Sequence, residues 1–381
     1  MKPMKRNALA VAIALAWVAP AFAADEKMVT KPGMPTFGQV MDASGVKVSG
    51  YVDTSYTYLS GTGFFTGLGY ANRVFDTERN SFNLNMVNLT VSMLPAKGFG
   101  GLVELNAGSD AKAITSAGTT NDEFDITQGY VHYANGSFHA IAGKYVTLAG
   151  AEVIRGPDNL NASRSILFGY AIPFTHTGVR GYYSVGETMK FIVGVNNGWD
   201  VVKESASVNG TQVADGKTFE FGAQLTPIKP LNLAVAIYSG EEPGTTVIGR
   251  RDLVDLVVTY NFTDNLSVTL NADVAKQGDA IATGRDAKWS GVAAYVGWKI
   301  ADQWRVAGRV EQFDDKNGYR TGLIQKWSEA TATLAYMPAA NAEIRLEGRY
   351  DKSNVATAFN QPSGPADNNQ YSMAVQALYK F

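Results

Sequence analysis

Pairs of arginines spaced four residues apart are the most distinctive charged feature of this sequence. Arg305 and Arg309 form one pair, and Arg345 and Arg349 form the other. Residues four apart lie on the same face of an extended strand, so each pair would place two guanidinium groups on one surface. Rows of fixed charge can orient water and select passing solutes by size, dipole and charge. Arg180 is a further strand-borne cation of this kind.

A long stretch between two strand-like segments, 147–175, supplies charges of both signs. It carries Glu152 and Asp158 together with Arg155 and Arg164, and it also contains several apolar residues near its end. A loop of this length within a compact fold is usually functional. Its apolar residues would pack against a wall, so we expect it to be folded and to play a part in function.

Catalytic chemistry has little support. The chain has no cysteine and only three histidines, His132, His139 and His176. A hydrolase would need one of them within reach of a serine, and a histidine near polar residues is more often a hydrogen-bonding wall residue. No zinc site, phosphate loop or calcium loop is recognisable, so we expect no enzyme activity, metal or cofactor; a lipase assay would test the alternative.

The first 23 residues have the pattern of an export signal. Basic residues precede an apolar run from Ala8 to Val18, and Ala21-Phe22-Ala23 resembles a cleavage site. Removal of the signal would leave 30 basic against 35 acidic residues, a charge of −5 that argues against a nucleic-acid partner. No later stretch is apolar enough for a spanning helix, so residence in a membrane would require a closed barrel.

Two-residue periodicity, the signal of a β-strand, recurs through the remainder of the chain. After a polar lead-in at 24–45, sixteen segments show it within a single domain at 46–381. The predicted strands are 46–59, 82–94, 99–108, 123–133, 138–146, 176–185, 189–197, 218–225, 231–239, 252–262, 266–276, 289–300, 304–313, 327–337, 342–351 and 370–381.

The connections between these strands alternate without exception between tight turns and longer polar links. This alternation and the even strand count predict an all-β fold: a transmembrane, antiparallel, up-and-down β-barrel. Aromatic residues fall into two bands that would mark the lipid interfaces. They are Tyr133, Phe138, Phe262, Trp304, Tyr336, Tyr379 and Phe381 beside the short turns, and Tyr58, Phe82, Trp199, Trp289, Trp327, Tyr350 and Tyr371 beside the long links. Between Phe82 and Met93 the apolar phase shifts, which predicts a β-bulge or an apolar stretch of inner wall.

Several segments resemble the OmpL-like family of β-barrel porins of Gram-negative bacteria. The matching pieces include 50–53 (GYVD), 128–131 (QGYV), 161–165 (NASRS), 173–180 (PFTHTGVR) and 196–200 (NNGWD), and the resemblance extends from about Val46 to Phe381. It implies a channel in the cell outer membrane, surrounded by lipid and open to small hydrophilic solutes or ions. The terminal Tyr379-Lys380-Phe381 resembles the strand end that the outer-membrane assembly machinery recognises.

A sixteen-stranded barrel encloses an aqueous lumen, and stretch 147–175, the third outer loop, is placed to fold inward and narrow it. We expect Glu152 and Asp158 to face a basic wall formed by Arg180, Arg305, Arg309, Arg345 and Arg349, with Arg155 and Arg164 at the same constriction. The simpler alternative is that the wall arginines only pair with Glu311, Glu343 and Glu347 across strands. A substrate-selective channel, a non-conducting structural or adhesin barrel, and either a monomer or a homotrimer are all compatible with the sequence.

Overall fold

The computed structural model describes residues 43–61, 73–119, 122–203, 207–208, 211–212, 216–243, 248–361 and 364–381. The predicted export signal, 1–23, and nearly all of the predicted lead-in, 24–45, lie outside these ranges. The chain divides into two compact units, and the unit Ser44–Phe381 holds every strand described below.

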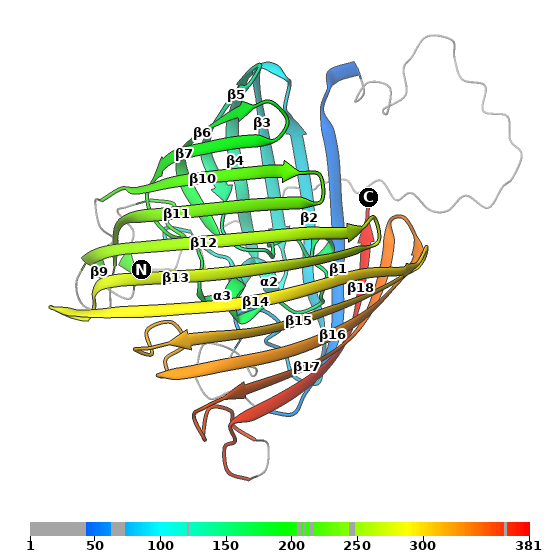
Figure 1. The fold of residues 1–381 in the computed structure, drawn as a ribbon, viewed down its shortest axis with the longest axis vertical. Helices are drawn as coiled ribbons and strands as arrows, with labels where there is room; N and C mark the ends of the chain where they lie inside the picture. The colour runs from blue at the N-terminus through cyan, green and yellow to red at the C-terminus, as the bar shows by residue number, and fades with distance from the viewer. Residues whose placement is uncertain are drawn as a thin grey trace, which may run out of the picture. The chain divides into compact units, whose positions relative to one another are not determined.

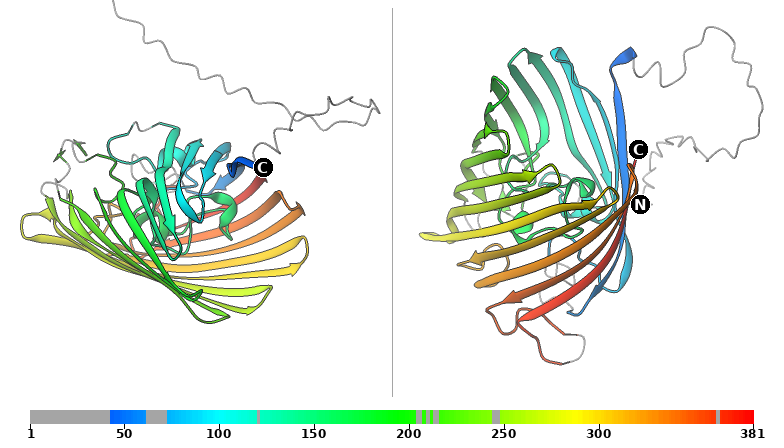
Figure 2. Two further views of the ribbon diagram at one scale, coloured as in Figure 1. Left: turned by 90° about the horizontal axis from the view of Figure 1, so that it is seen from above. Right: turned by 45° about the vertical axis from the view of Figure 1, so that its right-hand side comes forward.

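Sixteen antiparallel strands close into a barrel in which each strand pairs with its neighbours in sequence and β1 pairs with β18 (Figures 1 and 2). The barrel strands are β1 (Lys47–Leu59), β2 (Ser81–Met93), β3 (Lys97–Ala107), β4 (Phe124–Asn135), β5 (Phe138–Val146), β6 (Thr175–Val185), β7 (Met189–Asn196), β10 (Thr218–Ile228), β11 (Leu231–Pro243), β12 (Ile248–Thr263), β13 (Leu266–Ala282), β14 (Arg285–Ala301), β15 (Trp304–Asp315), β16 (Gln325–Ala339), β17 (Ala342–Ser353) and β18 (Asn369–Lys380). A separate pair, β8 (Ser207–Val208) and β9 (Thr211–Gln212), lies in the link after β7. The predicted sixteen-stranded barrel is confirmed.

Side chains alternate between an apolar exterior and a polar interior. In β17, Leu346 is 50% exposed on the outside whereas its neighbours Arg345 and Glu347 are 0% and 3% exposed on the inside. An apolar outer face matches lipid, and charged groups avoid it because they are costly at mid-depth in the bilayer. The interior can therefore hold charge and water.

Aromatic pairs mark both rims of the exterior. Beside the short turns, Phe99 packs on Tyr133 with ring centroids 5.0 Å apart, and beside the long links, Tyr58 packs on Tyr371 at 6.0 Å. The predicted bands were wrong in one respect: Trp199, Trp289 and Trp327 are 6%, 1% and 1% exposed and lie among the buried core residues. Position near a strand end does not specify which face a side chain takes, and these three face inward.

The predicted irregularity in β2 is a β-bulge. Asp53 of β1 pairs with Met86, but the next residue, Thr54, pairs with Leu84, so Asn85 is the extra residue. Both Asn85 and Met86 are consequently buried on the inside, and the apolar phase changes at that point.

One predicted long link is absent. β13 and β14 extend to Ala282 and Arg285, so only two residues join them, with Gly284 at a φ of 74°. Gly278, Asp279 and Gly284 resemble loop residues in the sequence, but pairing continues past an irregularity between Gln277 and Ala282. The strict alternation of short and long connections therefore fails at this hairpin.

The helical segments among the described barrel residues are short, and they include α2 (Ser109–Ala113), the 3₁₀ turn η1 (Gly156–Asp158) and α3 (Ile166–Tyr170). No helix within the described ranges is long and apolar enough to cross a membrane. The link between β5 and β6, residues 147–174, carries η1 and α3 inside the ring of strands (Figures 1 and 2). Its residues Ile166, Leu167 and Phe168 join Trp289 and Phe313 of the wall in one core cluster.

Candidate functional site

The inner loop, defined here as residues 147–174, crosses the lumen by contacting one wall strand after another. The amide N–H of Leu148 donates to Tyr238 Oη on β11 at 2.8 Å, and that of Ala151 donates to Asn271 Oδ1 on β13 at 3.1 Å. At the tip, Gly156 lies so close to β1 that a Cβ atom there would be 2.3 Å from Asp53 Oδ2. The loop therefore reaches β1, which lies four strands away from β5 in the barrel.

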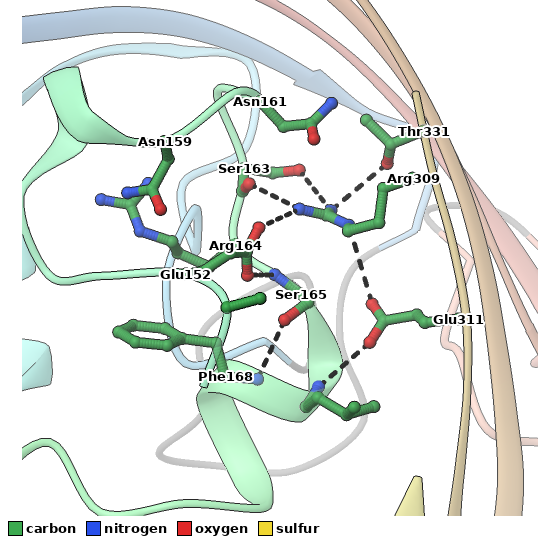
Figure 3. A network of polar contacts seen from close by, with 12 residues as sticks. Glu152, Asn159, Asn161, Ser163, Arg164, Ser165, Phe168, Arg309, Glu311 and Thr331 are labelled. Carbon is green, nitrogen blue, oxygen red and sulfur yellow. Dashed lines mark hydrogen bonds and ion pairs between the residues drawn. The ribbon is translucent and has the colours of Figure 1, made fainter. Parts of the chain in front are cut away.

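Arg309 on β15 is the centre of the contact between loop and wall (Figure 3). Its Nη1 donates to Glu152 Oε1 at 2.7 Å and to the Ser163 carbonyl at 2.8 Å, and its Nε donates to Glu329 Oε2 at 2.8 Å. The Arg309 side chain is 0% exposed. A buried charge of this kind is tolerated because ion pairs and hydrogen bonds offset its lost hydration.

Two further wall arginines, both on β17, hold loop carbonyl groups. Arg345 donates from Nη1 to the Asn161 carbonyl at 3.0 Å and from Nη2 to the Asn159 carbonyl at 2.9 Å. Arg349 donates from Nη1 to the Arg164 carbonyl at 2.6 Å. Their charges are offset by Glu343 and Asp351 on the same strand, each at 2.7 Å.

Wall carboxylates hold the amide groups of the same loop segment. Glu347 accepts from the N–H groups of Ala162 at 2.6 Å and Ser163 at 3.0 Å. Glu311 accepts from Ile166 at 2.7 Å and Leu167 at 3.0 Å, at the start of α3 (Figure 3). These contacts satisfy backbone groups that would otherwise be buried without partners, and so they fix the loop in one position.

Arg305 of the wall and Arg164 of the loop make further contacts where the loop is anchored to the wall. Arg305 pairs with Glu343 at 2.6 Å and reaches the Leu160 carbonyl at 3.3 Å. Arg164 folds back on its own loop, donating to the Ile154 carbonyl at 2.8 Å, and its amide N–H donates to Asp76 at 3.1 Å. Burial raises the pKa of the Asp76 carboxyl above its usual value, and the Arg164 charge opposes that rise.

Arg180 stands apart from this network. It forms a bidentate pair with Glu220 on β10, at 2.6 and 2.8 Å, and its guanidinium lies 4.1 Å from the ring centroid of Tyr145. Arg180 also donates a hydrogen bond from Nη1 to the carbonyl of Val146, the residue directly before the inner loop, at 3.0 Å. The structure therefore does not bring Arg180 together with the other predicted wall arginines.

Arg155 and Asp158 at the loop tip face the other half of the wall, where space remains. The two form an ion pair at 2.9 Å, and their side chains are 32% and 54% exposed. Arg155 Nη1 reaches across to Asn88 Oδ1 on β2 at 3.3 Å and lies 3.9 Å from Glu104 Oε1 on β3. A cavity of about 290 Å³ opens here, lined by Glu104, Gln128, Leu148, Glu152, Arg155, Asp158 and Phe174 among others.

The expected arrangement, an acidic loop facing a basic wall across open water, is not the one observed. Arg309, Arg345 and Arg349 lie beneath the loop and are 1%, 0% and 3% exposed, and Glu152 is bound to Arg309. The alternative pairing with wall glutamates is present as well, as the Arg305–Glu343 contact shows. Asp158 alone of the two predicted loop acids remains exposed.

The part of the wall that faces the exposed loop tip was not predicted from the sequence. Glu104, Asn88 and Gln128 line this side. In the predicted strand 99–108, Glu104 and Asn106 alternate with the outward Val103, so the periodicity already placed Glu104 inside. What the sequence did not show was which side of the lumen the loop would leave uncovered.

A closed sixteen-stranded barrel with an apolar exterior, a polar interior and a loop folded inside is an outer-membrane channel of the porin class. The chain belongs to the OmpL-like porin family: the family described as "Putative beta-barrel porin-2, OmpL-like" matches residues 45–381. The expected resemblance, channel class and outer-membrane location are thus confirmed.

Solved structures of other outer-membrane proteins share the fold at low sequence identity. The outer membrane channel DcaP of Acinetobacter baumannii is 15% identical, and the two structures have a TM-score of 0.61. The match covers 88% of this chain and 97% of the DcaP chain. The anion-selective porin from Comamonas acidovorans is 13% identical with a TM-score of 0.61 over 88% and 99% of the two chains. The trimer form of OmpT of Vibrio cholerae is 11% identical with a TM-score of 0.56 over the same shares. Among curated proteins, no sequence matches the chain.

Proposed function

We propose that the channel is water-filled and that small hydrophilic solutes or ions diffuse through an aperture between the loop tip and strands β2–β4. The observation that carries this proposal is the position of Arg155. Its guanidinium is partly exposed and spans from the loop to Asn88 and Glu104 of the wall. Elsewhere in the lumen, hydrogen bonds anchor the loop to β11, β13, β15 and β17.

The aperture carries charges of both signs at close range. Arg155 and Asp158 project from the loop. Glu104 lines the wall beside them, is 2% exposed and accepts hydrogen bonds from Asn88 and Gln128. Charged rings in a narrow aqueous passage select ions because the surrounding protein screens them poorly. We expect Arg155 to favour anions and Glu104 to favour cations, so the selectivity of the channel depends on their balance.

Planar-bilayer recordings test this proposal. The refolded wild-type protein should conduct; absence of conductance would favour the structural or adhesin barrel. Arg155→Gln should shift the reversal potential in a salt gradient toward cation preference, and Glu104→Gln should shift it toward anion preference. Arg250→Gln removes a charge that is 70% exposed and paired with Asp252, so it should change neither. Equal reversal potentials in all four proteins would overturn the assignment of the aperture.

We further infer that the histidines have packing roles and that the protein is not an enzyme. His176 is fully buried, contacts the Gly198 carbonyl through Nδ1 at 3.0 Å, and stacks on Tyr238 at 4.7 Å between centroids. His132 and His139 contact each other, with ring nitrogens 3.4 Å apart. Measurable lipase activity of the refolded barrel, lost on His176→Gln, would contradict this inference.

Assembly into a homotrimer is part of the same proposal. A lipid-side hollow of about 670 Å³ covers β14–β18 and is lined by small residues, Ala294, Gly308, Ala330, Ala332 and Gly348, beside Val310 and Tyr350. A second copy could approach the sheet closely there, and OmpT of Vibrio cholerae is known in a trimer form.

At the other end of β18, Phe381 exchanges two backbone hydrogen bonds with Gly50 of β1 at 2.9 and 3.0 Å. We propose that the assembly machinery of the outer membrane recognises this strand end.

A further inference from the structure

The cavity at the aperture is large enough to hold a small solute. Its volume is about 290 Å³, which corresponds to about ten water molecules at the density of the liquid. It lies between the inner loop, which supplies Leu148, Val153, Arg155 and Asp158, and the wall, where β3 supplies Glu104. A solute of up to about ten non-hydrogen atoms would therefore fit.

Arg155 and Asp158 present one charge of each sign to this cavity. Arg155 Nε donates to Asp158 Oδ2 at 2.9 Å, and Arg155 Nη1 contacts Asn88 Oδ1 at 3.3 Å. Among the residues that the structure describes, Arg155 Nη2 and Asp158 Oδ1 make no hydrogen bond, and the two side chains are 32% and 54% exposed. A donor and an acceptor on neighbouring charged groups thus remain for a solute.

The other two carboxylates that line the cavity are bound by protein groups. Glu104 accepts hydrogen bonds from Asn88 at 2.8 Å and from Gln128 at 2.6 Å, and Glu152 is paired with Arg309 at 2.7 Å. Both carboxylates are buried. The accessible charge of the cavity is therefore one cation and one anion, and it best matches a solute that carries both signs and is neutral as a whole.

Beside the charged pair, the inner loop exposes an apolar side chain to the lumen. Val153 is 42% exposed and lies two residues before Arg155. Leu148, which is partly buried, lines the same cavity. Removal of such apolar surface from water is favourable, at about 25 cal/mol per Å². A solute with an apolar group would gain this contribution, whereas a wholly polar solute would not.

We propose that the aperture cavity binds zwitterionic solutes that carry an apolar side chain, that is, α-amino acids of about the size of leucine. The Arg155 guanidinium would bind the carboxylate and Asp158 the ammonium group. Val153 and Leu148 would pack against the side chain. The inference rests on the proposed channel function, because it names the solute class for the same aperture. Binding would be weak, since a solute that passes through must also leave.

Saturation-transfer NMR on the full-length refolded protein in detergent tests the site without any measurement of conductance. Leucine should receive saturation from the protein, most strongly at its methyl groups. The analogues 3-methylbutylamine, 4-methylpentanoate and glycine lack the carboxylate, the ammonium group and the apolar side chain, respectively. We expect the first two to bind about three- to fivefold more weakly than leucine, and glycine about tenfold more weakly. Empty micelles give the background.

Each variant should remove one of these preferences and keep the other two. Arg155→Gln should bind 3-methylbutylamine no more weakly than leucine, Asp158→Asn should bind 4-methylpentanoate no more weakly than leucine, and Val153→Ser should lose the preference for leucine over glycine. Arg250→Gln, which removes an exposed charge paired with Asp252, should keep all of them. The three loop side chains are partly exposed, so these variants should refold, and a heat-dependent gel shift reports the folded barrel.

The proposal fails if glycine or either singly charged analogue binds the wild type as tightly as leucine does. Preferences that persist in both Arg155→Gln and Asp158→Asn would show that leucine binds elsewhere. A wild type that conducts but does not bind leucine would overturn the site and leave the proposed channel intact. Leucine binding with the expected preferences by a wild type that does not conduct would support the site and count against the channel.

Discussion

Arginine performs a specific task at the contact between loop and wall that lysine could not perform. Arg309 bonds five oxygen-bearing groups from a planar guanidinium, three of them on the loop and two on the wall. Arg345 similarly binds loop carbonyls with both Nη atoms. A planar group with five fixed donors can satisfy several acceptors at once, whereas an ammonium group is a single strongly hydrated point charge. The charged arginines of the wall therefore hold the backbone of the inner loop in position.

Removal of the Arg309 charge should strongly destabilise the protein, because it leaves buried carboxylates without a compensating positive charge. Arg309→Gln should lower the free energy of unfolding by about 3–5 kcal/mol, since Glu152 and Glu329 lose their shared partner. The double variant with Glu152→Gln should be more stable than the sum of the single effects predicts, because it removes one of the stranded charges. Urea unfolding followed by tryptophan fluorescence measures both.

The matched control for this prediction is Arg250→Gln, whose ion pair is exposed and should contribute less than about 1 kcal/mol. Strict additivity of Arg309→Gln and Glu152→Gln would show that the two side chains do not interact. A cost for Arg309→Gln no larger than that of Arg250→Gln would contradict its role as the anchor.

At the scale of elements, the inner loop is held through its backbone, so its path depends on close approach to the wall. Gly156 is the tightest point, since a Cβ there would meet Asp53 on β1. Gly156→Val should displace the tip and raise single-channel conductance without unfolding the barrel. Gly129→Ala on β4 is the control, because its added Cβ would have ordinary contact with Ile126 at 3.6 Å. Conductance equal to that of the control would show that the tip does not limit flow.

The strands could be predicted from the sequence, but the partners of the loop could not. Lipid outside and water inside impose the two-residue period directly, so β17 was recognisable from Ile344 and Leu346 alternating with Arg345 and Glu347. The length of the loop can also be read directly from the sequence, and it indicated a functional segment. Its contacts, however, join residues far apart, such as Glu152 and Arg309, and no local pattern specifies them. For the same reason Trp199, Trp289 and Trp327 were placed on the lipid side although they lie inside.

At the scale of the whole molecule, the lipid-side hollow over β14–β18 predicts self-association. The wild type in mild detergent should have the mass of three chains plus bound detergent, and Ala332→Trp, which fills the hollow, should shift it toward one chain. Light scattering coupled to size exclusion measures this. A monomeric wild type, or a trimer that the substitution leaves intact, would contradict the proposed interface.

We propose that the inner loop seals one half of the lumen and leaves the aperture on the side of Arg155 and Asp158. Because the chain has no cysteine, single cysteines can be modified specifically while conductance is recorded. A methanethiosulfonate reagent should react with Asp158→Cys and reduce the current at once. It should leave Ala162→Cys, which is 5% exposed and bound to Glu347, unmodified and conducting. Rapid block through Ala162→Cys, or full current after modification of Asp158→Cys, would contradict the account.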